Sequence, residues 1–292
     1  MKVVFFGSSK YVIPIIEVLK RDFDLVLVVT TERNSSDPIP SYCLSQKIPY
    51  LSVSNLSNYT MNHELLTINP LVGVLADFGL IIPKEILSSF PKGIINIHPS
   101  LLPKYRGPTP VQQAILNGDK KTGVTIIKLD NEVDHGPILA QEKVLISPSD
   151  TAQILYEKLF KIGAELLHQN LNKYIKGELK LSEQDHSKAT FTKLLTREDG
   201  FFDIDNPPSK DILDRMIRAY YPWPGVWTNV QISTPNKQQL TTNKKLEVIS
   251  QKLEVRIKFL PGNLIQVEGK KPMSYKDFLN GYPETKELLK HI

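Results

Sequence analysis

The sequence predicts an α/β domain with a mainly parallel sheet, followed by a small β-barrel. Up to about residue 200, short apolar β-branched runs alternate with stretches of helical apolar spacing, which is typical of a parallel sheet. Beyond residue 225 several short alternating strands follow one another, as in a small barrel. The pattern loosens around 201–208, so we place the two domains at residues 1–204 and 205–292.

The strands and helices of the first domain follow from the spacing of its apolar residues. Strands are expected where apolar, β-branched residues run together, and helices where apolar residues recur every three or four positions. These rules place strands at 2–7, 25–29, 71–75, 94–97, 124–129 and 138–146. They place helices at 11–20, 109–118 and 150–177.

Capping residues fix the ends of two of these helices. Thr109 is a predicted N-cap, and Pro110 suits the first helical position because its missing N–H would be unpaired there anyway. Gly118 ends that helix, since glycine readily adopts the left-handed conformation of a helix end. Asp150 opens the long third helix and Gly177 closes it. In the second domain, helical spacing over 212–217 precedes strands at 226–232, 246–249, 253–259 and 264–267.

Composition limits the class of protein. The 292 residues are 41% hydrophobic and 23% charged, which suits a soluble globular protein. No apolar run approaches the ~20 residues that cross a bilayer, and the N-terminus lacks a signal-peptide pattern, so no membrane partner is expected. Cys43 is the only cysteine, which excludes an internal disulfide and favours a reducing, cytoplasmic compartment.

The positive charge is unevenly distributed. The chain carries a net charge of +5, and residues 219–292 hold all of that excess, with 11 Lys and Arg against 6 Asp and Glu. A basic segment on a neutral body favours a polyanionic partner. Ordinary solubilising lysines are the alternative explanation.

Asn96, His98 and Asp134 form the strongest candidate for a catalytic site. Asn96 and His98 lie two residues apart at the end of a buried strand, so their side chains face the same way. Asp134 lies in a turn after another strand, beside Gly136, which permits close backbone approach. Ligands of open α/β sheets bind at the carboxyl ends of the strands. From spacing alone, a purely structural role for His98 is the alternative.

The chemistry of these three side chains favours group transfer to an amine. An asparagine amide can donate to a developing oxyanion, and a histidine can carry a proton near neutral pH. A carboxylate can orient that imidazole or stabilise its cation. No serine or cysteine beside His98 forms a nucleophile motif, so the nucleophile is expected to come from a substrate.

Two other classes of site are disfavoured. The histidines show no close metal-ligand spacing, so no metal is expected. The turn Gly7-Ser8-Ser9 lacks the G-x-G-x-x-G set, which argues against a nicotinamide enzyme.

Several segments share their motifs with one known enzyme family. They are residues 5–7, 78–83, 96–107 and 134–141. The Asn-x-His-Pro-Ser-Leu-Leu-Pro run from residue 96, paired with the later Asp134, is highly specific. Nearly the whole chain resembles the N10-formyltetrahydrofolate-dependent formyltransferases. The resemblance implies a Rossmann-like formyltransferase domain followed by a C-terminal barrel of OB type.

Within that family, the residues 110–115, 222–225 and 268–273 resemble those of the members that formylate initiator methionyl-tRNA. The resemblance implies that the formyl group of N10-formyltetrahydrofolate passes to the methionine amine, leaving tetrahydrofolate. We expect the protein to be a monomer. A nucleotide-linked amino sugar is the alternative acceptor, although its enzyme would not need a basic C-terminal domain. A non-enzymatic RNA-binding protein on this fold is a further alternative.

The resemblance also implies roles for individual residues. Asn96 and His98 would stabilise the tetrahedral oxyanion, and His98, assisted by Asp134, would manage proton transfer between the amine and N10. The implied folate contacts are Leu80, Ile81, Ile82, Ser100, Leu101, Leu102, Pro103 and Asp130. The predicted tRNA contacts are Arg33, Arg106, Lys270 and Lys271.

One segment departs from the family. Many members that act on tRNA have a longer, glycine-rich, basic loop after the second strand. Here residues 30–47 carry only Arg33 and Lys47 as cations, so recognition of the acceptor stem is expected to differ.

Overall fold

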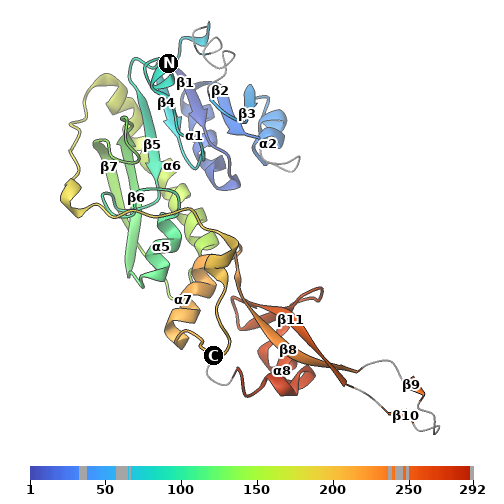
Figure 1. The fold of residues 1–292 in the computed structure, drawn as a ribbon. Coiled ribbons are helices and arrows are strands. Elements are labelled where there is room, and N and C mark those ends of the chain that lie inside the picture. The colour runs from blue at the N-terminus through green and yellow to red at the C-terminus, as the bar shows by residue number, and fades with distance from the viewer. Residues whose placement is uncertain are drawn as a thin grey trace. The chain divides into compact units, whose positions relative to one another are not determined.

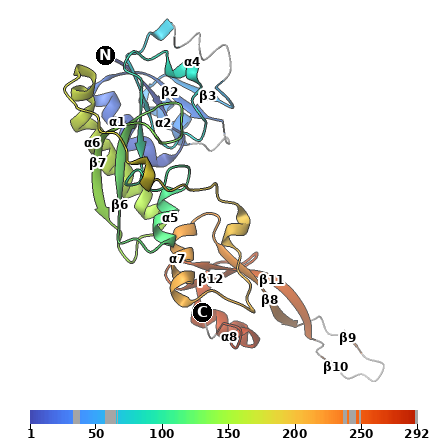
Figure 2. The ribbon, with the colours of Figure 1, turned by 60° about the vertical axis from the view of Figure 1, so that its left-hand side comes forward.

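The computed structural model describes residues 1–32, 38–56, 65, 67–235, 239–240, 246–247 and 250–289. They form two compact units (Figures 1 and 2). The first unit comprises residues 1–114, 119–147 and 154–194, and the second comprises 115–118, 148–153 and 195–292. The boundary between residues 204 and 205 stays a prediction.

A seven-stranded sheet forms the centre of the first unit. Its strands are β1 (Lys2–Phe6), β2 (Asp24–Thr31), β3 (Tyr50–Val53), β4 (Val72–Leu75), β5 (Ile94–His98), β6 (Lys121–Lys128) and β7 (Ile138–Leu145). They lie in the order β3-β2-β1-β4-β5-β6-β7. The first five pair in parallel, whereas β6 and β7 are antiparallel to their neighbours. The predicted α/β class with a mainly parallel sheet is confirmed.

The helices of the first unit connect these strands. They are α1 (Ile13–Asp22), preceded by the 3-10 turn η1 (Lys10–Val12), α2 (Pro38–Gln46), α4 (Lys84–Leu87), α5 (Pro110–Leu116) and α6 (Ala152–Lys176), followed by η2 (His186–Lys188). The sequence did not predict α2, β3 or α4. Helix α2 carries two prolines and buries only Ile39 and Cys43, so its sequence lacks the apolar periodicity that would predict a helix. No helix in the described ranges is long and apolar enough to cross a membrane.

Strand β5 presents alternate residues to the two faces of the sheet. Ile97 packs under α6, where Gly163 comes so close that an added Cβ would lie 2.7 Å from the isoleucine side chain. Ile94 faces the other way, into an apolar cluster that includes Phe6 and Phe78. Because side chains alternate along a strand, Asn96 shares the face of Ile94. The polar end of β5 therefore lies on the face opposite α6.

From residue 195 on, the described residues of the second unit form a small antiparallel β domain with two α-helices. It contains η3 (Arg197–Gly200), α7 (Lys210–Tyr220), β8 (Val226–Pro235), β9 (Gln239–Leu240), β10 (Leu246–Glu247), β11 (Ser250–Leu260), β12 (Leu264–Val267), β13 (Met273–Ser274), α8 (Tyr275–Gly281) and η4 (Pro283–Thr285). Four strands form a sheet in the order β13-β12-β11-β8, and β9 pairs with β10. Trp227, Ile257 and Ile265 are buried in this unit. This architecture is consistent with the predicted small barrel-like domain; residues 248 and 249 of one predicted strand lie outside the described residues.

Candidate active site

The carboxylate of Asp134 joins the end of β5 to the loop that follows it. Asn96 Nδ2 donates to Asp134 Oδ1 at 2.9 Å, and the backbone N–H of Gly107 donates to Asp134 Oδ2 at 2.8 Å. His98 Nδ1 lies 3.5 Å from the same Oδ2 atom. All three predicted catalytic side chains therefore meet at one point. Each of these residues is at most 8% exposed, so the charge on Asp134 is held by protein donors rather than by bulk water.

The proton on His98 has a defined place on the imidazole ring. His98 Nε2 lies 2.9 Å from the backbone oxygen of Tyr105. A carbonyl oxygen only accepts hydrogen bonds, so Nε2 carries its hydrogen and donates it there. Nδ1 is then the ring atom that faces Asp134 and is free to exchange a proton. Its 3.5 Å separation from Asp134 is longer than a hydrogen bond, and such contacts commonly tighten when substrate binds.

The turn that carries Asp134 is tightly folded against the end of β6. Asp134 adopts a φ of 49°, a left-handed conformation that is uncommon for residues other than glycine. At Gly136 an added Cβ would lie 1.9 Å from the backbone oxygen of Lys128. Lys128 in turn donates its N–H to the oxygen of Pro137 at 2.9 Å. Glycine is required at 136 because two backbone segments touch there.

A cavity of 160 Å³ opens beside this cluster. Four of the predicted folate contacts line it together with Asn96 and Asp134, namely Leu80, Ile81, Ile82 and Asp130. Leu75, Leu87 and Leu129 supply further apolar wall. Two lining residues are exposed apolar side chains, Ile81 at 83% and Val133 at 55%. An apolar slot with a few polar groups is typical of a site for a small molecule.

The other four predicted folate contacts do not line that cavity. Ser100 is fully buried and its hydroxyl donates to the oxygen of Lys104. The hydroxyl of Thr125 on β6 donates to Ser100 O at 2.6 Å and accepts from the N–H of Leu102 at 3.2 Å. Leu101 lines a separate hollow with Lys104 and Lys121. The structure thus fastens residues 100–103 to β6, and their contact with a ligand stays a prediction.

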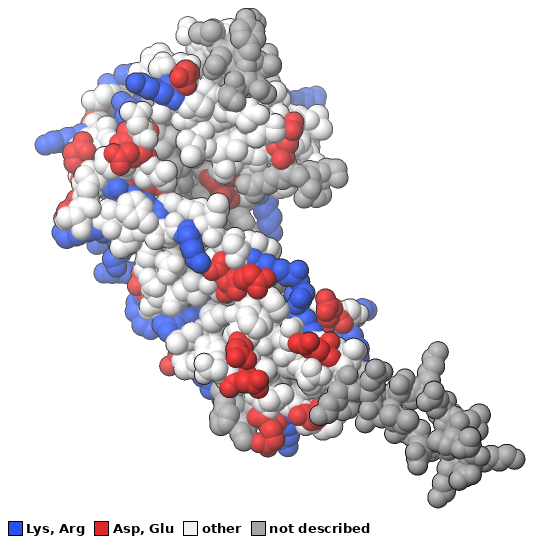
Figure 3. All heavy atoms as spheres, viewed as in Figure 1, with Lys and Arg blue, Asp and Glu red and all other residues white. Residues whose placement is uncertain are grey.

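The four predicted tRNA contacts have different surroundings. Arg106 is 3% exposed and donates to Gln184 Oε1 and His186 Nδ1, so its burial does not support contact with a phosphate. Lys270 and Lys271 are exposed after β12, where Lys270 Nζ lies 2.6 Å from the hydroxyl of Tyr282. Arg33 lies outside the described residues. On the face shown in Figure 3, basic and acidic side chains are interspersed over the second unit.

Sequence reasoning missed three groups that contact the catalytic cluster. They are the backbone oxygen of Tyr105, the backbone N–H of Gly107 and the side chain of Gln184, which donates to Asp134 O at 2.9 Å. Backbone groups leave no side-chain signature in a sequence. Gln184 lies in a polar run after α6, 50 positions from Asp134, where no periodicity distinguishes it.

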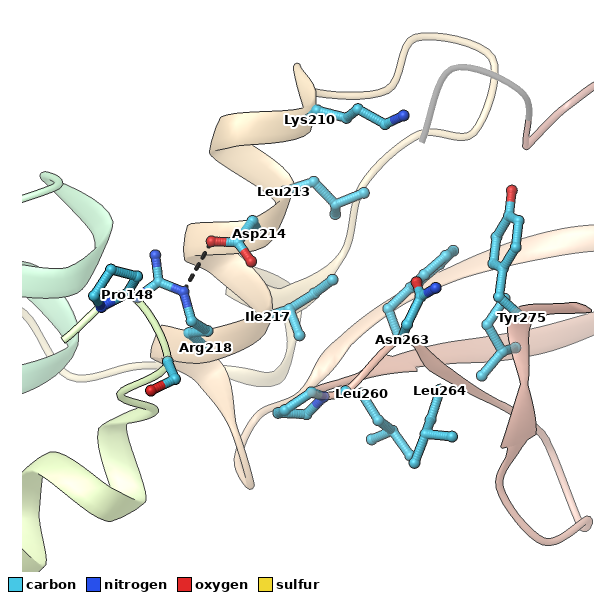
Figure 4. Close-up of a pocket in the computed structure, with 15 residues that line it drawn as sticks. Pro148, Lys210, Leu213, Asp214, Ile217, Arg218, Leu260, Asn263, Leu264 and Tyr275 are labelled. Carbon is cyan, nitrogen blue, oxygen red and sulfur yellow. Dashed lines mark hydrogen bonds and ion pairs between the residues drawn. The ribbon is translucent and has the colours of Figure 1, made fainter.

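Other candidate sites lack catalytic chemistry. A cavity of 630 Å³ in the second unit lies between α7 and the turn from β11 to β12 (Figure 4). Leu213 and Ile217 face it, and its polar wall includes an ion pair between Arg218 and Asp214. Burial raises the pKa of the Cys43 thiol to about 11, so it is a poor nucleophile. Within the described parts of the chain, no group of three or more His, Cys, Asp or Glu side chains could hold a metal ion.

Comparison with known proteins identifies relatives of both units. Residues 1–171 match the family model described as formyl transferase, and residues 194–283 match the formyl transferase C-terminal domain. The chain is 42% identical over 238 residues to a methionyl-tRNA formyltransferase of Roseiflexus sp. (strain RS-1), covering 78% of this chain and 73% of the relative. It is 30% identical over 302 residues to the protein of that name from Coxiella burnetii, covering 97% and 96%. A sugar N-formyltransferase structure from Shewanella sp. FDAARGOS_354 has a similar fold, with a TM-score of 0.64 at 20% identity, covering 86% of this chain and 97% of that chain.

Proposed function

The chain belongs to the formyltransferase family, and we propose that it transfers the formyl group of N10-formyltetrahydrofolate to the α-amine of methionine on initiator tRNA. The observation that carries the proposal is the convergence of Asn96, His98 and Asp134 beside an apolar slot. The relatives named methionyl-tRNA formyltransferase support the choice of acceptor.

Asn96 is proposed to stabilise the oxyanion of the reaction. The amine attacks the formyl carbon, so negative charge develops on the formyl oxygen as the new C–N bond forms. One hydrogen of Asn96 Nδ2 is used by Asp134, and the second remains to donate to that oxygen. Because Asp134 fixes the amide in place, the donor needs no reorientation as the charge appears. One such donor lowers a barrier by about 3 kcal/mol.

His98 and Asp134 are proposed to move the proton. The attacking amine must lose a proton, and N10 of the departing tetrahydrofolate must gain one as the old C–N bond breaks. His98 Nδ1 is the ring atom available for both steps, since Nε2 is held by Tyr105 O. The Asp134 carboxylate, 3.5 Å away, stabilises the imidazolium that forms between them.

The slot beside Asn96 is proposed to hold one ring system of the folate. Members of this family use formyltetrahydrofolate donors. The volume of the slot, 160 Å³, is well below the ~300–1,000 Å³ of a site that encloses a whole drug-sized ligand. It therefore fits a flat heterocycle, with Ile81 and Val133 covering the ligand where it leaves the slot. The amide and carboxylate groups at its inner end supply polar partners for ring nitrogens.

Replacing Ile81 by aspartate is expected to raise the KM for the folate about tenfold, with kcat within twofold of wild type. Ile81 is 83% exposed, so its loss should change stability by less than about 0.5 kcal/mol. Covering its side chain with the ligand is worth about 1 to 2 kcal/mol, which is roughly tenfold in affinity. Leu44→Asp is the matched control, because Leu44 is 66% exposed on α2 and does not line the slot. An unchanged KM in Ile81→Asp would remove Ile81 from the folate site.

The second unit is proposed to contribute contacts to tRNA phosphates. Residues 219–292 carry the whole positive excess of the chain, and Lys270 and Lys271 are exposed there. Replacing both with alanine is expected to lower the salt dependence of tRNA binding by about 2 in the log–log slope, since each phosphate contact contributes about 1. Lys173→Ala with Lys176→Ala, two exposed lysines of α6, is the matched control. Equal slopes for both double variants would argue against a specific role for Lys270 and Lys271.

A formyl-transfer assay with three acceptors tests the proposed function. The purified protein and N10-formyltetrahydrofolate would be offered initiator methionyl-tRNA, elongator methionyl-tRNA and a nucleotide-linked 4-amino sugar in parallel. Formylation of the initiator tRNA alone is expected. Turnover of the sugar alone would keep the fold and the chemistry of Asn96, His98 and Asp134, but would overturn the acceptor.

Two further proposals concern the cellular location and the oligomeric state of the protein. We propose a cytoplasmic location, in keeping with the relatives named methionyl-tRNA formyltransferase, and a monomeric state. Light scattering during chromatography, with and without tRNA, would test the monomer.

A further inference from the structure

The side chain of Gln184 uses all its hydrogen-bonding groups on the two loops of the proposed active site. Gln184 is 5% exposed and lies after α6. Its Nε2 donates to Asp134 O at 2.9 Å and to Gly136 O at 2.8 Å. Its Oε1 accepts from Arg106 Nη2 at 2.9 Å. One side chain therefore ties the turn of Asp134 to the loop of Arg106.

The backbone on both sides of Gln184 is fixed to the same loops. Before it, Ser182 and Ile138 exchange two backbone hydrogen bonds, at 2.7 and 3.0 Å. After it, the N–H of Arg106 donates to Thr190 O, and the N–H of Thr192 donates to Arg106 O, both at 2.8 Å. Gln184 is thus placed by its own segment and is not a mobile surface side chain.

The turn that Gln184 holds needs support. Asp134 has a φ of 49°, and a residue other than glycine keeps that conformation only where its surroundings impose it. The Asp134 carboxylate must also stay within reach of Asn96 and His98. If the two bonds from Gln184 were lost, the oxygens of Asp134 and Gly136 would lack those donors, and the turn could relax.

A second connection between the two loops runs through stacked imidazole rings. Arg106 Nη2 lies 2.7 Å from His186 Nδ1, and arginine only donates, so His186 accepts there. The ring of His186 stacks on that of His135 with centroids 4.0 Å apart, and His135 Nδ1 lies 2.7 Å from Asp130 Oδ2. These contacts hold Asp130 and His135 in the turn that carries Asp134. Loss of Gln184 should therefore loosen this turn without unfolding it.

We propose that Gln184 is a positioning residue for formyl transfer. It holds the Asp134–Gly136 turn against the Arg106 loop and so fixes the Asp134 carboxylate relative to His98. The inference rests on the proposed function, because it assigns Gln184 to that reaction. Gln184 acts through Asp134 and does not itself reach the reacting atoms.

Two substitutions separate the donor pair from the bond to Arg106. Gln184→Met removes every hydrogen bond at similar volume, and Gln184→Glu keeps an acceptor for Arg106 but loses both N–H donors. Both variants are expected to lose about 10- to 100-fold in kcat, because a displacement of about 1 Å in a reacting group costs up to about 100-fold. The KM for the folate should change less than threefold, since Gln184 does not line the slot.

Tyr174→Phe is the matched control. The Tyr174 hydroxyl donates to the backbone oxygen of Lys92, so this variant also loses a partly buried hydrogen bond from a side chain to a carbonyl, but outside the site. Its kcat should stay within twofold of wild type. Amide hydrogen exchange over residues 130–137 should speed up in Gln184→Met and stay unchanged in Tyr174→Phe.

Two results would overturn the positioning role. One is a kcat within twofold of wild type in folded Gln184→Met or Gln184→Glu, and the other is unchanged exchange over 130–137 in Gln184→Met. A wild-type protein that formylates no tRNA would contradict the proposed function instead. The exchange measurement would still decide whether Gln184 holds the turn, because it needs no acceptor.

Discussion

Replacing Asp134 by asparagine is expected to lower kcat for formyl transfer by about a thousandfold. In the native protein both carboxylate oxygens accept hydrogen bonds, one from Asn96 Nδ2 and the other from the N–H of Gly107. An asparagine has one oxygen and one NH₂ group, so in either orientation a donor faces another donor. The variant also removes the negative charge that lies 3.5 Å from His98 Nδ1. The substitution therefore weakens both the stabilisation of the oxyanion and the proton transfer.

Asp22→Asn is the matched control for this substitution. Asp22 is also a carboxylate paired with a histidine, since His168 Nδ1 lies 2.7 Å from its Oδ2 atom. The hydrogen bond from Arg21 lowers the pKa of Asp22 to about 2, so Asp22 is ionised at neutral pH. It lies at the end of α1 and does not line the slot. Single-turnover rates should fall only in Asp134→Asn; a rate near wild type in that variant would remove Asp134 from the mechanism.

The part of this site that could be predicted from the sequence is the part that depends on local geometry. The period of two along β5 is enough to put Asn96 and His98 on one face. The meeting of Asp134 with Asn96 bridges 38 positions. It was predicted because both residues follow the ends of strands, where ligands of open α/β sheets bind, and the family resemblance supported it. The backbone partners at Tyr105 and Gly107 could not be predicted, because they depend on the path of a loop and not on residue type.

Neighbouring residues of the motif do not all line the slot. Ser100 follows His98 by two residues but is not among the lining residues, and Thr125 fastens its loop to β6. Ile81 lies 15 positions before Asn96 and lines the same slot. Helix α2 was missed for a related reason: its burial depends on contacts with the sheet, and its own sequence has no strong apolar face. The conformation of such segments depends on tertiary contacts, and a single sequence does not reveal those contacts.

Gly136→Ala is expected to impair both stability and catalysis, although it adds a single methyl group. Its Cβ would lie 1.9 Å from the backbone oxygen of Lys128 and 3.5 Å from the N–H nitrogen of Asp130. Both neighbours are backbone atoms, so neither can move aside as a flexible side chain would. The turn must open, and the free energy of unfolding should fall by about 3 kcal/mol, the upper end of the range for overpacking.

Opening this turn would also displace Asp134 and the hydrogen bond between Gln184 and Gly136 O. The oxygen of Gly136 accepts from Gln184, and Asp134 lies two residues earlier in the same turn. We therefore expect kcat to fall about 100-fold even at temperatures where Gly136→Ala is fully folded. Gly281→Ala is the control, because an added Cβ there meets nothing within 4 Å. If thermal unfolding and single-turnover rates of Gly136→Ala both matched those of Gly281→Ala, the close approach at Lys128 would not be what holds Asp134 in place.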